Sequence, residues 1–90
     1  MTKNEVAKEI SKKTGFDFEG SKANVEAFME VIKEALHNGK PVFLRGFGTF
    51  TAKQRAAKVA RNISKGTTLP VPAHKVPHFK PCDEFKASLL

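Results

Sequence analysis

The apolar positions at the start of the chain recur with the period of an α-helix. Val6 and Ile10 mark one apolar face of such a helix. Thr2 stands three residues before Glu5, which is the spacing of a capping box, and Gly15 is suited to the helix end. These signals predict a first amphipathic helix that ends near Gly15.

A longer apolar stripe predicts a second helix that begins at Ser21 and ends at Gly39. The stripe consists of Val25, Phe28, Met29, Ile32 and Leu36. Phe16 and Phe18 lie in the connection, where we expect them to cover the open end of the helix pair. Residues 1–40 are therefore expected to form a helical hairpin with one shared apolar side.

The second half of the chain changes to short runs that are typical of strands. Residues 41–44 are a candidate for a buried strand, and residues 45–48 form a turn with two glycines around an aromatic residue. Residues 49–51 resume a strand, and residues 76–79 are a further candidate. Asp83 can cap a short terminal helix.

The segment between these strands gives conflicting signals. Residues 52–61 are rich in Ala, Lys and Arg, so propensity alone predicts a basic helix. One face of that helix would carry Arg55, Lys58 and Arg61. However, residues 67–72 are extended and residues 64–66 favour a turn, which together fit a projecting two-stranded arm.

Charge is distributed unevenly along the 90 residues, whose formal net charge is +7. Residues 1–34 hold six Lys and seven Asp or Glu, whereas residues 35–82 hold nine Lys or Arg and no acidic residue. Such a one-sided basic segment attracts polyanions, most often a DNA or RNA backbone and next an anionic membrane. A solvated face kept for solubility is the alternative, but solubility does not require a segment free of carboxylates.

The chain length limits the core that one subunit can form. A domain of this size buries only about 60–65% of the surface that it exposes when unfolded, and sharing apolar surface with a second subunit is a common remedy. The sequence has a single cysteine, Cys82, and no apolar run typical of a secretion signal or a membrane span. We therefore expect a dimeric, cytoplasmic protein.

Four ordered segments of the sequence resemble the bacterial histone-like HU/integration host factor family. They are Arg45-Gly46-Phe47-Gly48-Thr49-Phe50, Arg55, Ala60-Arg61-Asn62 and Lys75-Val76-Pro77-His78-Phe79. A Gly-Phe-Gly turn alone would be weak evidence, but the ordered set is specific and the resemblance spans essentially the whole chain.

The resemblance implies a single α+β domain that forms an intertwined dimer. Its parts would be a helical hairpin (1–40), a three-stranded antiparallel sheet (41–54 and 74–80), a two-stranded β-ribbon arm that binds DNA (55–73) and a C-terminal helix (83–90). The family pattern therefore favours strands over the helix that propensity suggests for residues 52–61.

The resemblance also implies a function, which is nucleoid-associated binding and bending of duplex DNA with little dependence on sequence. The arms would enter the minor groove, and an apolar residue at each tip would wedge between base pairs. Ile63 takes this role here, where the family usually has proline. Site-specific bending of the integration-host type is the alternative, and the partner subunit could be a second copy or a paralogue.

The candidate DNA-binding residues are mainly the cations of the second half. They are Lys53, Arg55, Lys58, Arg61, Asn62, Ile63, Lys65, Lys75, Lys80 and Lys86. Asn62 is equally suited to a minor-groove hydrogen bond and to a turn. Phe47, Phe50 and Phe79 are expected to belong to the dimer core rather than to stack on bases.

Other chemistries have little support in the sequence. His74, His78 and Cys82 are spaced four residues apart. A strand does not bring side chains at this spacing together around one metal ion. No phosphate-binding loop or nucleophile–base pair is present, so we expect no enzyme, no cofactor and no small-molecule substrate.

Two further binding partners are also disfavoured. A membrane-binding helix would need bulky apolar residues opposite the charges of residues 52–61. RNA or single-strand binding normally relies on exposed aromatic residues, and the arm has none.

Overall fold

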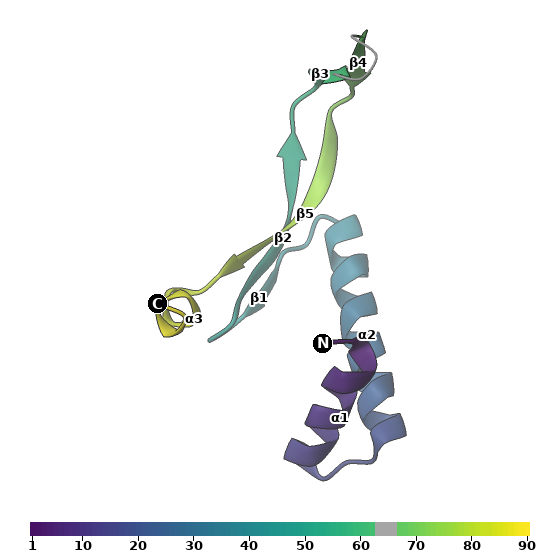
Figure 1. The fold of residues 1–90 in the computed structure, drawn as a ribbon, viewed down its shortest axis with the longest axis vertical. Coiled ribbons are helices and arrows are strands. Elements are labelled where there is room, and N and C mark those ends of the chain that lie inside the picture. The colour runs from purple at the N-terminus through teal and green to yellow at the C-terminus, as the bar shows by residue number, and fades with distance from the viewer. Residues whose placement is uncertain (63–66) are drawn as a thin grey trace. The chain divides into compact units, whose positions relative to one another are not determined.

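The computed structural model describes residues 1–62 and 67–90 of the chain, with the order of elements α1–α2–β1–β2–β3–β4–β5–α3 (Figure 1). The chain divides into two compact units, Met1–Ala35 and Leu36–Leu90. The first unit contains helix α1 and most of helix α2. The second unit contains all five strands and helix α3.

Helix α1 (Lys3–Thr14) has the ends that its sequence predicts. The Thr2 hydroxyl accepts a hydrogen bond from the Glu5 backbone N–H at 3.3 Å, which satisfies one of the unpaired donors of the first turn. Gly15 adopts a left-handed conformation (φ 79°) and its N–H donates to the Ser11 carbonyl. Glycine takes this conformation without the steric cost that a Cβ would add.

Helix α2 (Phe18–His37) begins three residues before the predicted start at Ser21. The prediction was wrong because Asp17, which precedes Phe18, caps this helix. Its carboxylate accepts from the Gly20 N–H at 2.7 Å, and its carbonyl accepts from the Ser21 N–H. Phe18 therefore lies within the helix, and Phe16, at 62% exposure, does not cover the end of the pair as expected.

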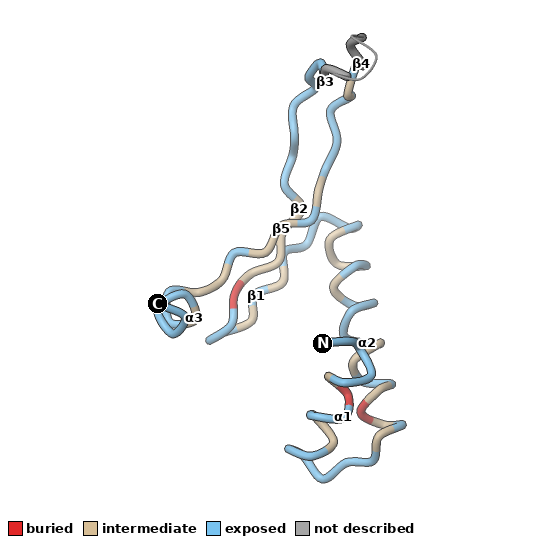
Figure 2. The backbone as a smooth tube through the Cα atoms, in the orientation of Figure 1, coloured by how far each residue is buried: buried red, intermediate tan, exposed pale blue. Residues whose placement is uncertain are grey.

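The small residues Ala7 and Ser21 are fully buried between α1 and α2. Figure 2 shows both buried positions on the sides of the two helices that face each other. Within the part of the chain whose burial is described, Ala7 is the only fully buried hydrophobic residue. One chain therefore encloses very little apolar core by itself.

Replacing Ser21 with alanine is expected to stabilise the protein. The Ser21 hydroxyl is buried and has no hydrogen-bond partner among the described residues, and an unpaired buried hydroxyl costs about 1–3 kcal/mol. Alanine keeps the Cβ and has a higher helix propensity. Denaturant unfolding at fixed protein concentration should show a gain of roughly 1 kcal/mol, and a loss of stability would contradict this assignment.

An ion pair joins the two helices at their exposed sides. Lys3 Nζ lies 2.9 Å from Glu26 Oε1, and this hydrogen bond, with the charge of the ammonium, holds the pKa of Glu26 below its ordinary value. A lowered carboxyl pKa stabilises the fold at neutral pH, and the contribution is lost as the pH falls through the lowered pKa. Because both side chains are nearly half exposed, the effect is expected to be small and sensitive to salt.

The variant Glu26→Gln tests this pair. It should lower the thermal midpoint slightly at pH 7 and leave the midpoint unchanged at a pH where the carboxyl is already protonated. Glu30→Gln, on the same helix, serves as a control for the removal of a charge. An equal shift at both pH values would show that the ion pair is not the cause.

Three strands form an antiparallel sheet in the second unit. They are β1 (Val42–Leu44), β2 (Gly48–Arg55) and β5 (His74–Pro81), in the order β1-β2-β5. The register pairs Phe50 with Phe79 and continues without a break to Arg55 opposite His74. The short β1 is an edge strand, and its end is joined to β2 by a turn in which Gly46 has a φ of 82°.

Four phenylalanine rings gather on one side of this sheet. The Phe79 ring centroid lies 4.7 Å from that of Phe50 and 4.9 Å from that of Phe47. Phe85 of helix α3 (Asp83–Ser88) stacks on Phe47 with centroids 5.5 Å apart. The sequence indicated three of these rings, and the fourth, Phe85, joins them from helix α3.

Residues 52–61 do not form the basic helix that local propensity predicts. They continue β2 as far as Arg55 and then form β3 (Lys58–Asn62), which pairs with β4 (Thr67–Val71) in a separate two-stranded sheet. Pairing with β4 and β5 supplies backbone hydrogen bonds that outweigh the intrinsic helix preference of Ala, Lys and Arg. The ribbon implied by the family resemblance is the arrangement found.

Helix α3 (Asp83–Ser88) is capped by Cys82 and not by Asp83 as predicted. Cys82 has the extended backbone of an N-cap, and its Sγ accepts from the Phe85 N–H at 3.4 Å. Asp83 is instead the first helical residue, where its carboxylate complements the helix dipole. No helix in the described ranges, 1–62 and 67–90, has the length and apolarity needed to cross a membrane.

The α+β fold class predicted for the chain is confirmed. A helical pair, a three-stranded antiparallel sheet, a two-stranded sheet beyond it and a short terminal helix occur in the expected order.

Candidate nucleic-acid interface

The unbroken register of β2 and β5 assigns their residues to two faces. Directly paired residues lie on the same face, and successive residues of a strand alternate between faces. The apolar face carries Phe50 and Phe79. The opposite face, which we call the basic face, carries Thr49, Thr51, Lys53, Arg55, His74, Val76, His78 and Lys80.

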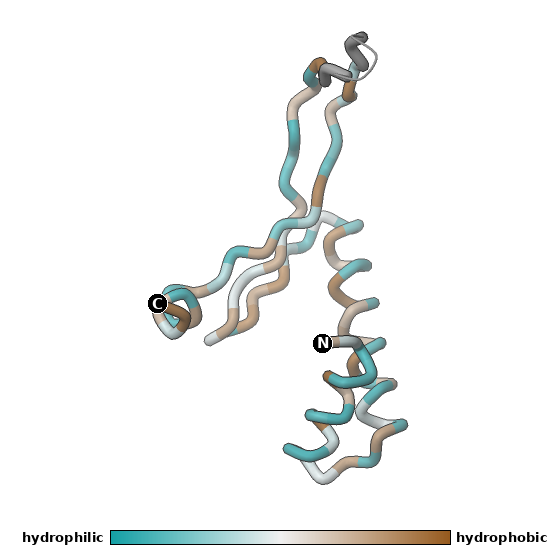
Figure 3. Tube along the Cα trace, in the orientation of Figure 1, coloured by the Kyte–Doolittle hydropathy of each residue, from teal (hydrophilic) through white to brown (hydrophobic). Residues whose placement is uncertain are grey.

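Three of the predicted DNA-binding residues share the basic face. Lys53, Arg55 and Lys80 are all exposed, and the described part of the chain shows none of them in a salt bridge. Figure 3 shows hydrophilic stretches on both β2 and β5 where they extend beyond β1, with a hydrophobic stretch between them on β5. Lys75 pairs with Gln54 and therefore lies on the opposite face, together with Phe50 and Phe79. The sequence pattern alone did not separate Lys75 from the other three.

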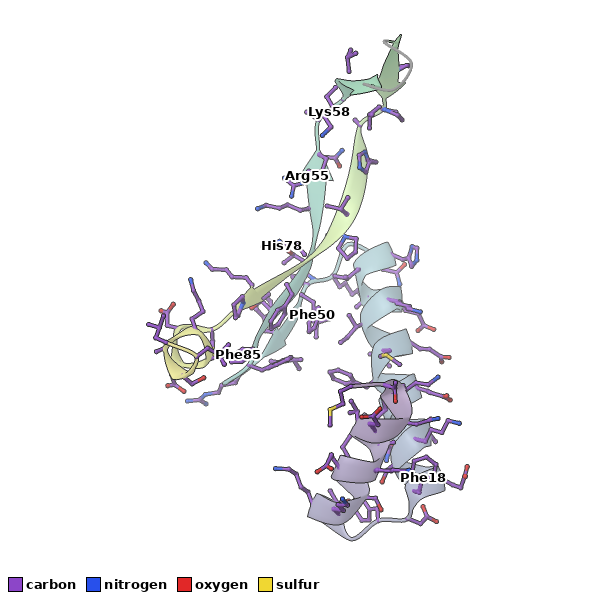
Figure 4. All side chains as sticks on the ribbon, in the orientation of Figure 1. Phe18, Phe50, Arg55, Lys58, His78 and Phe85 are labelled. Atoms are coloured by element: carbon purple, nitrogen blue, oxygen red, sulfur yellow. The ribbon has the colours of Figure 1, made fainter. Side chains whose placement is uncertain are left out.

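The two-stranded sheet of β3 and β4 carries further predicted residues. Lys58 is exposed and pairs with Val71, Arg61 pairs with Thr68, and Asn62 pairs with Thr67. In Figure 4 Arg55 and Lys58 extend outward from the ribbon. Two other predicted residues, Ile63 and Lys65, lie outside the described part of the chain.

A short break separates the two sheets on both sides of the ribbon. Residues 56–57 and 72–73 belong to no strand. Pro72 cannot donate a hydrogen bond to a ladder, and its carbonyl lies 2.8 Å from His74 Nδ1. Pro70, by contrast, stays within β4 opposite Val59 at an edge, where a missing donor is tolerated.

Helix α3 limits the basic region at the other end of the sheet. Asp83 and Glu84 are exposed in its first turn, and Lys86 follows two residues after Glu84. Two carboxylates beside one ammonium make this helix electrostatically unfavourable for a phosphate. Of the predicted contacts, Lys86 therefore has the least favourable surroundings.

Sequence reasoning missed several side chains of the basic face. His74 and His78 share it with the cations, and the signal that places them there is the strand register. In the described part of the chain, His, Cys, Asp and Glu form no group of three that could hold a metal ion.

An exposed basic face that continues into a β-ribbon defines a nucleic-acid-binding protein of the β-ribbon class. Residues 1–89 match the family model described as "Bacterial DNA-binding protein". The chain belongs to this bacterial DNA-binding protein family, which confirms the resemblance found in the sequence.

Individual relatives cover almost the whole chain. It is 37% identical over 87 residues to integration host factor subunit alpha of Aliivibrio fischeri, a match that spans 97% of this chain and 89% of the relative. It is also 37% identical over 86 residues to the SPbeta prophage-derived DNA-binding protein HU 2 of Bacillus subtilis, covering 96% and 94% of the two chains.

Solved structures show the same fold. The Anabaena HU–DNA cocrystal structure superposes with a TM-score of 0.93 at 30% identity, over 99% of this chain and 97% of that one. HU from Thermotoga maritima superposes with a TM-score of 0.70 at 26% identity, over the full length of both chains.

Proposed function

We propose that the protein binds and bends duplex DNA as an architectural protein, with its basic face against the phosphates and its ribbon in the minor groove. The observation that carries this proposal is the shared face of Lys53, Arg55 and Lys80 on strands that continue, after the short break at residues 56–57 and 72–73, into β3 and β4. Cations on one face neutralise adjacent phosphates and release condensed counterions. Membership of a DNA-binding family supports the same conclusion.

The binding is largely independent of base sequence. Lysine and arginine side chains bind phosphates regardless of the base, whereas sequence reading requires side chains fitted to base edges. In this proposal Arg55, Lys58 and Arg61 are the main contacts, and Lys53 and Lys80 bind the flanks. Lys65, Lys75 and Lys86 contribute less, and Asn62 hydrogen-bonds in the minor groove.

Competition binding tests the partner and the lack of sequence preference together. A labelled random-sequence duplex should be displaced equally by unrelated duplexes, and much less by RNA or by anionic vesicles. A strong preference for one duplex sequence would instead indicate site-specific bending of the integration-host type. Displacement by RNA or vesicles at equal charge would contradict the proposal.

The active form is a homodimer. Large apolar side chains remain exposed on helix α2 of a single chain, among them Phe28 at 47% and Val31 at 61%. A second copy that covers them, and that packs on Phe47, Phe50 and Phe79, supplies the core that one chain lacks. The protein performs no catalysis in this proposal and is cytoplasmic and nucleoid-associated.

Ile63 acts as the wedge at the tip of the arm. An apolar side chain inserted at a base step unstacks the base pairs and kinks the duplex. Replacing Ile63 with alanine is expected to reduce the bend more than the affinity, as measured by energy transfer between the ends of a labelled duplex. An unchanged bend would remove this role from Ile63 without affecting the proposed phosphate contacts.

A further inference from the structure

His74 is the first residue of β5 and lies at the base of the two-stranded ribbon. The residue is exposed, and its Nδ1 lies 2.8 Å from the Pro72 carbonyl oxygen, on the other side of the break in this strand. A carbonyl oxygen only accepts hydrogen bonds, so Nδ1 carries the hydrogen of this contact. Nε2 is then the unprotonated nitrogen of the neutral ring, and it is the atom that takes up a proton when the ring becomes charged.

The strands around His74 carry cations and no carboxylate. Strand β5 is an edge strand of its sheet, so β2 is its neighbour there, and the register places Arg55 directly opposite His74. The titratable and charged groups that share this face, all from β2 and β5, are Lys53, Arg55, His78 and Lys80. Lys58 begins β3 beyond the break, and residues 35–82 contain no acidic residue. A negative charge beside a charged His74 must therefore come from a ligand.

A DNA phosphate supplies this negative charge, and it distinguishes the two forms of the ring. Phosphate oxygens in the DNA backbone accept hydrogen bonds and have none to donate. The neutral ring would present the lone pair of Nε2 to these oxygens, which is repulsive. The charged ring presents an N–H at the same position and makes a charge-assisted hydrogen bond. Contact between His74 and a phosphate therefore requires the additional proton.

We propose that His74 binds a DNA phosphate as the imidazolium ion, so that DNA binding takes up a proton at Nε2 and becomes tighter as the pH falls. The inference rests on the proposed function, which brings the duplex against Arg55 and its neighbours. Lysine and arginine keep their charge at neutral pH, whereas histidine ordinarily changes charge between pH 5 and 8. His74 thus adds a phosphate contact that depends on pH.

The sign of the effect follows from linkage between the proton and the DNA. Because DNA binds the charged ring in preference, bound His74 holds its proton up to a higher pH than free His74 does. The added affinity is complete at a pH where free His74 is already charged. It is lost as the pH rises through the range in which DNA-bound His74 gives up its proton.

Calorimetric titration of an intact duplex in two buffers of different ionisation enthalpy counts the protons taken up on binding. At constant ionic strength the wild-type protein should take up at most about one proton per chain, and its affinity should fall about tenfold between about pH 6 and pH 8. His74→Asn keeps an amide that can donate to the Pro72 carbonyl but does not titrate. It should abolish the proton uptake and weaken binding at the lower pH only.

The variant His74→Lys separates the charge of the side chain from its structural role. Lysine stays charged throughout this pH range, so this variant should bind tightly at both pH values without proton uptake. His78→Asn is the matched control, because His78 lies on the same strand and face but farther from the ribbon. It should keep the proton uptake of the wild type. Unfolding curves at both pH values check that every variant is folded.

Two results would overturn the inference and leave the proposed function intact. One is binding of the duplex by the wild-type protein without proton uptake. The other is proton uptake that persists in His74→Asn or disappears in His78→Asn. Failure of the wild-type protein to bind the duplex at low salt, at either pH, would overturn the proposed function as well.

Discussion

Replacing Lys53 and Arg55 together with glutamine is expected to weaken binding to any duplex by roughly tenfold to a hundredfold at moderate salt. Both side chains are exposed on the basic face, and no acidic residue shares that face. In a homodimer the double substitution removes four phosphate contacts. The logarithmic salt dependence of the affinity should therefore become shallower by about 3 to 4 units of slope.

Lys75→Gln is the matched control for this experiment. Lys75 lies on the neighbouring strand, but its side of the sheet is that of Phe50 and Phe79. It removes one charge from the same region, as the single variant Lys53→Gln does, and should change the salt slope much less than that variant. If Lys75→Gln weakened binding as much as Lys53→Gln, net charge would determine the affinity, and the assignment of a basic face would be wrong.

Replacing Gly48 with alanine is expected to destabilise the fold by about 2–3 kcal/mol. An added Cβ would lie 2.5 Å from the Lys80 carbonyl oxygen and 2.6 Å from the Phe79 ring. The neighbouring strand cannot withdraw without breaking its pairing with β2, and the ring is held by Phe47 and Phe50. Glycine is therefore required at this position by close approach and not by its backbone conformation.

Gly15→Ala separates these two causes. Gly15 has a φ of 79° but open space around its Cα, so alanine there costs only the left-handed conformation, about 1 kcal/mol. Denaturant unfolding of both variants at the same protein concentration measures the difference. A Gly48→Ala variant no less stable than Gly15→Ala would show that the sheet repacks around the added methyl group.

The hydrophobic periodicity predicted the helices well, because each helix is specified by residues close together in the sequence. The apolar stripe and the Thr2 cap located α1 correctly. The start of α2 was missed because Asp17 competes with Ser21 as a cap, and both are good capping residues. The sequence alone does not decide which of two good capping residues starts the helix, because that choice depends on how the two helices pack.

The strands of the arm could not be predicted from local propensity. Residues 52–61 favour a helix in isolation, and their extended structure depends on partners in β4 and β5 that are distant in sequence. The ordered family motifs corrected this prediction because they carry information about the whole fold.

The candidate site was predicted as a set of residues but not as a surface. Lys75 and Lys80 look equivalent in the sequence, yet the register places them on opposite faces. The exposure of Phe43 was missed for the same reason, because a short apolar run does not reveal which of its residues face solvent. Strand register, which depends on pairing across the sheet, supplies this information.

Salt titration of the bend in a random-sequence duplex labelled at both ends tests the central claim most directly. The account predicts tight binding at low salt, a shorter distance between the duplex ends in the complex, and an affinity that falls steeply as salt rises. Binding that leaves the end-to-end distance unchanged would contradict DNA bending, and an absence of binding at low salt would contradict DNA binding itself.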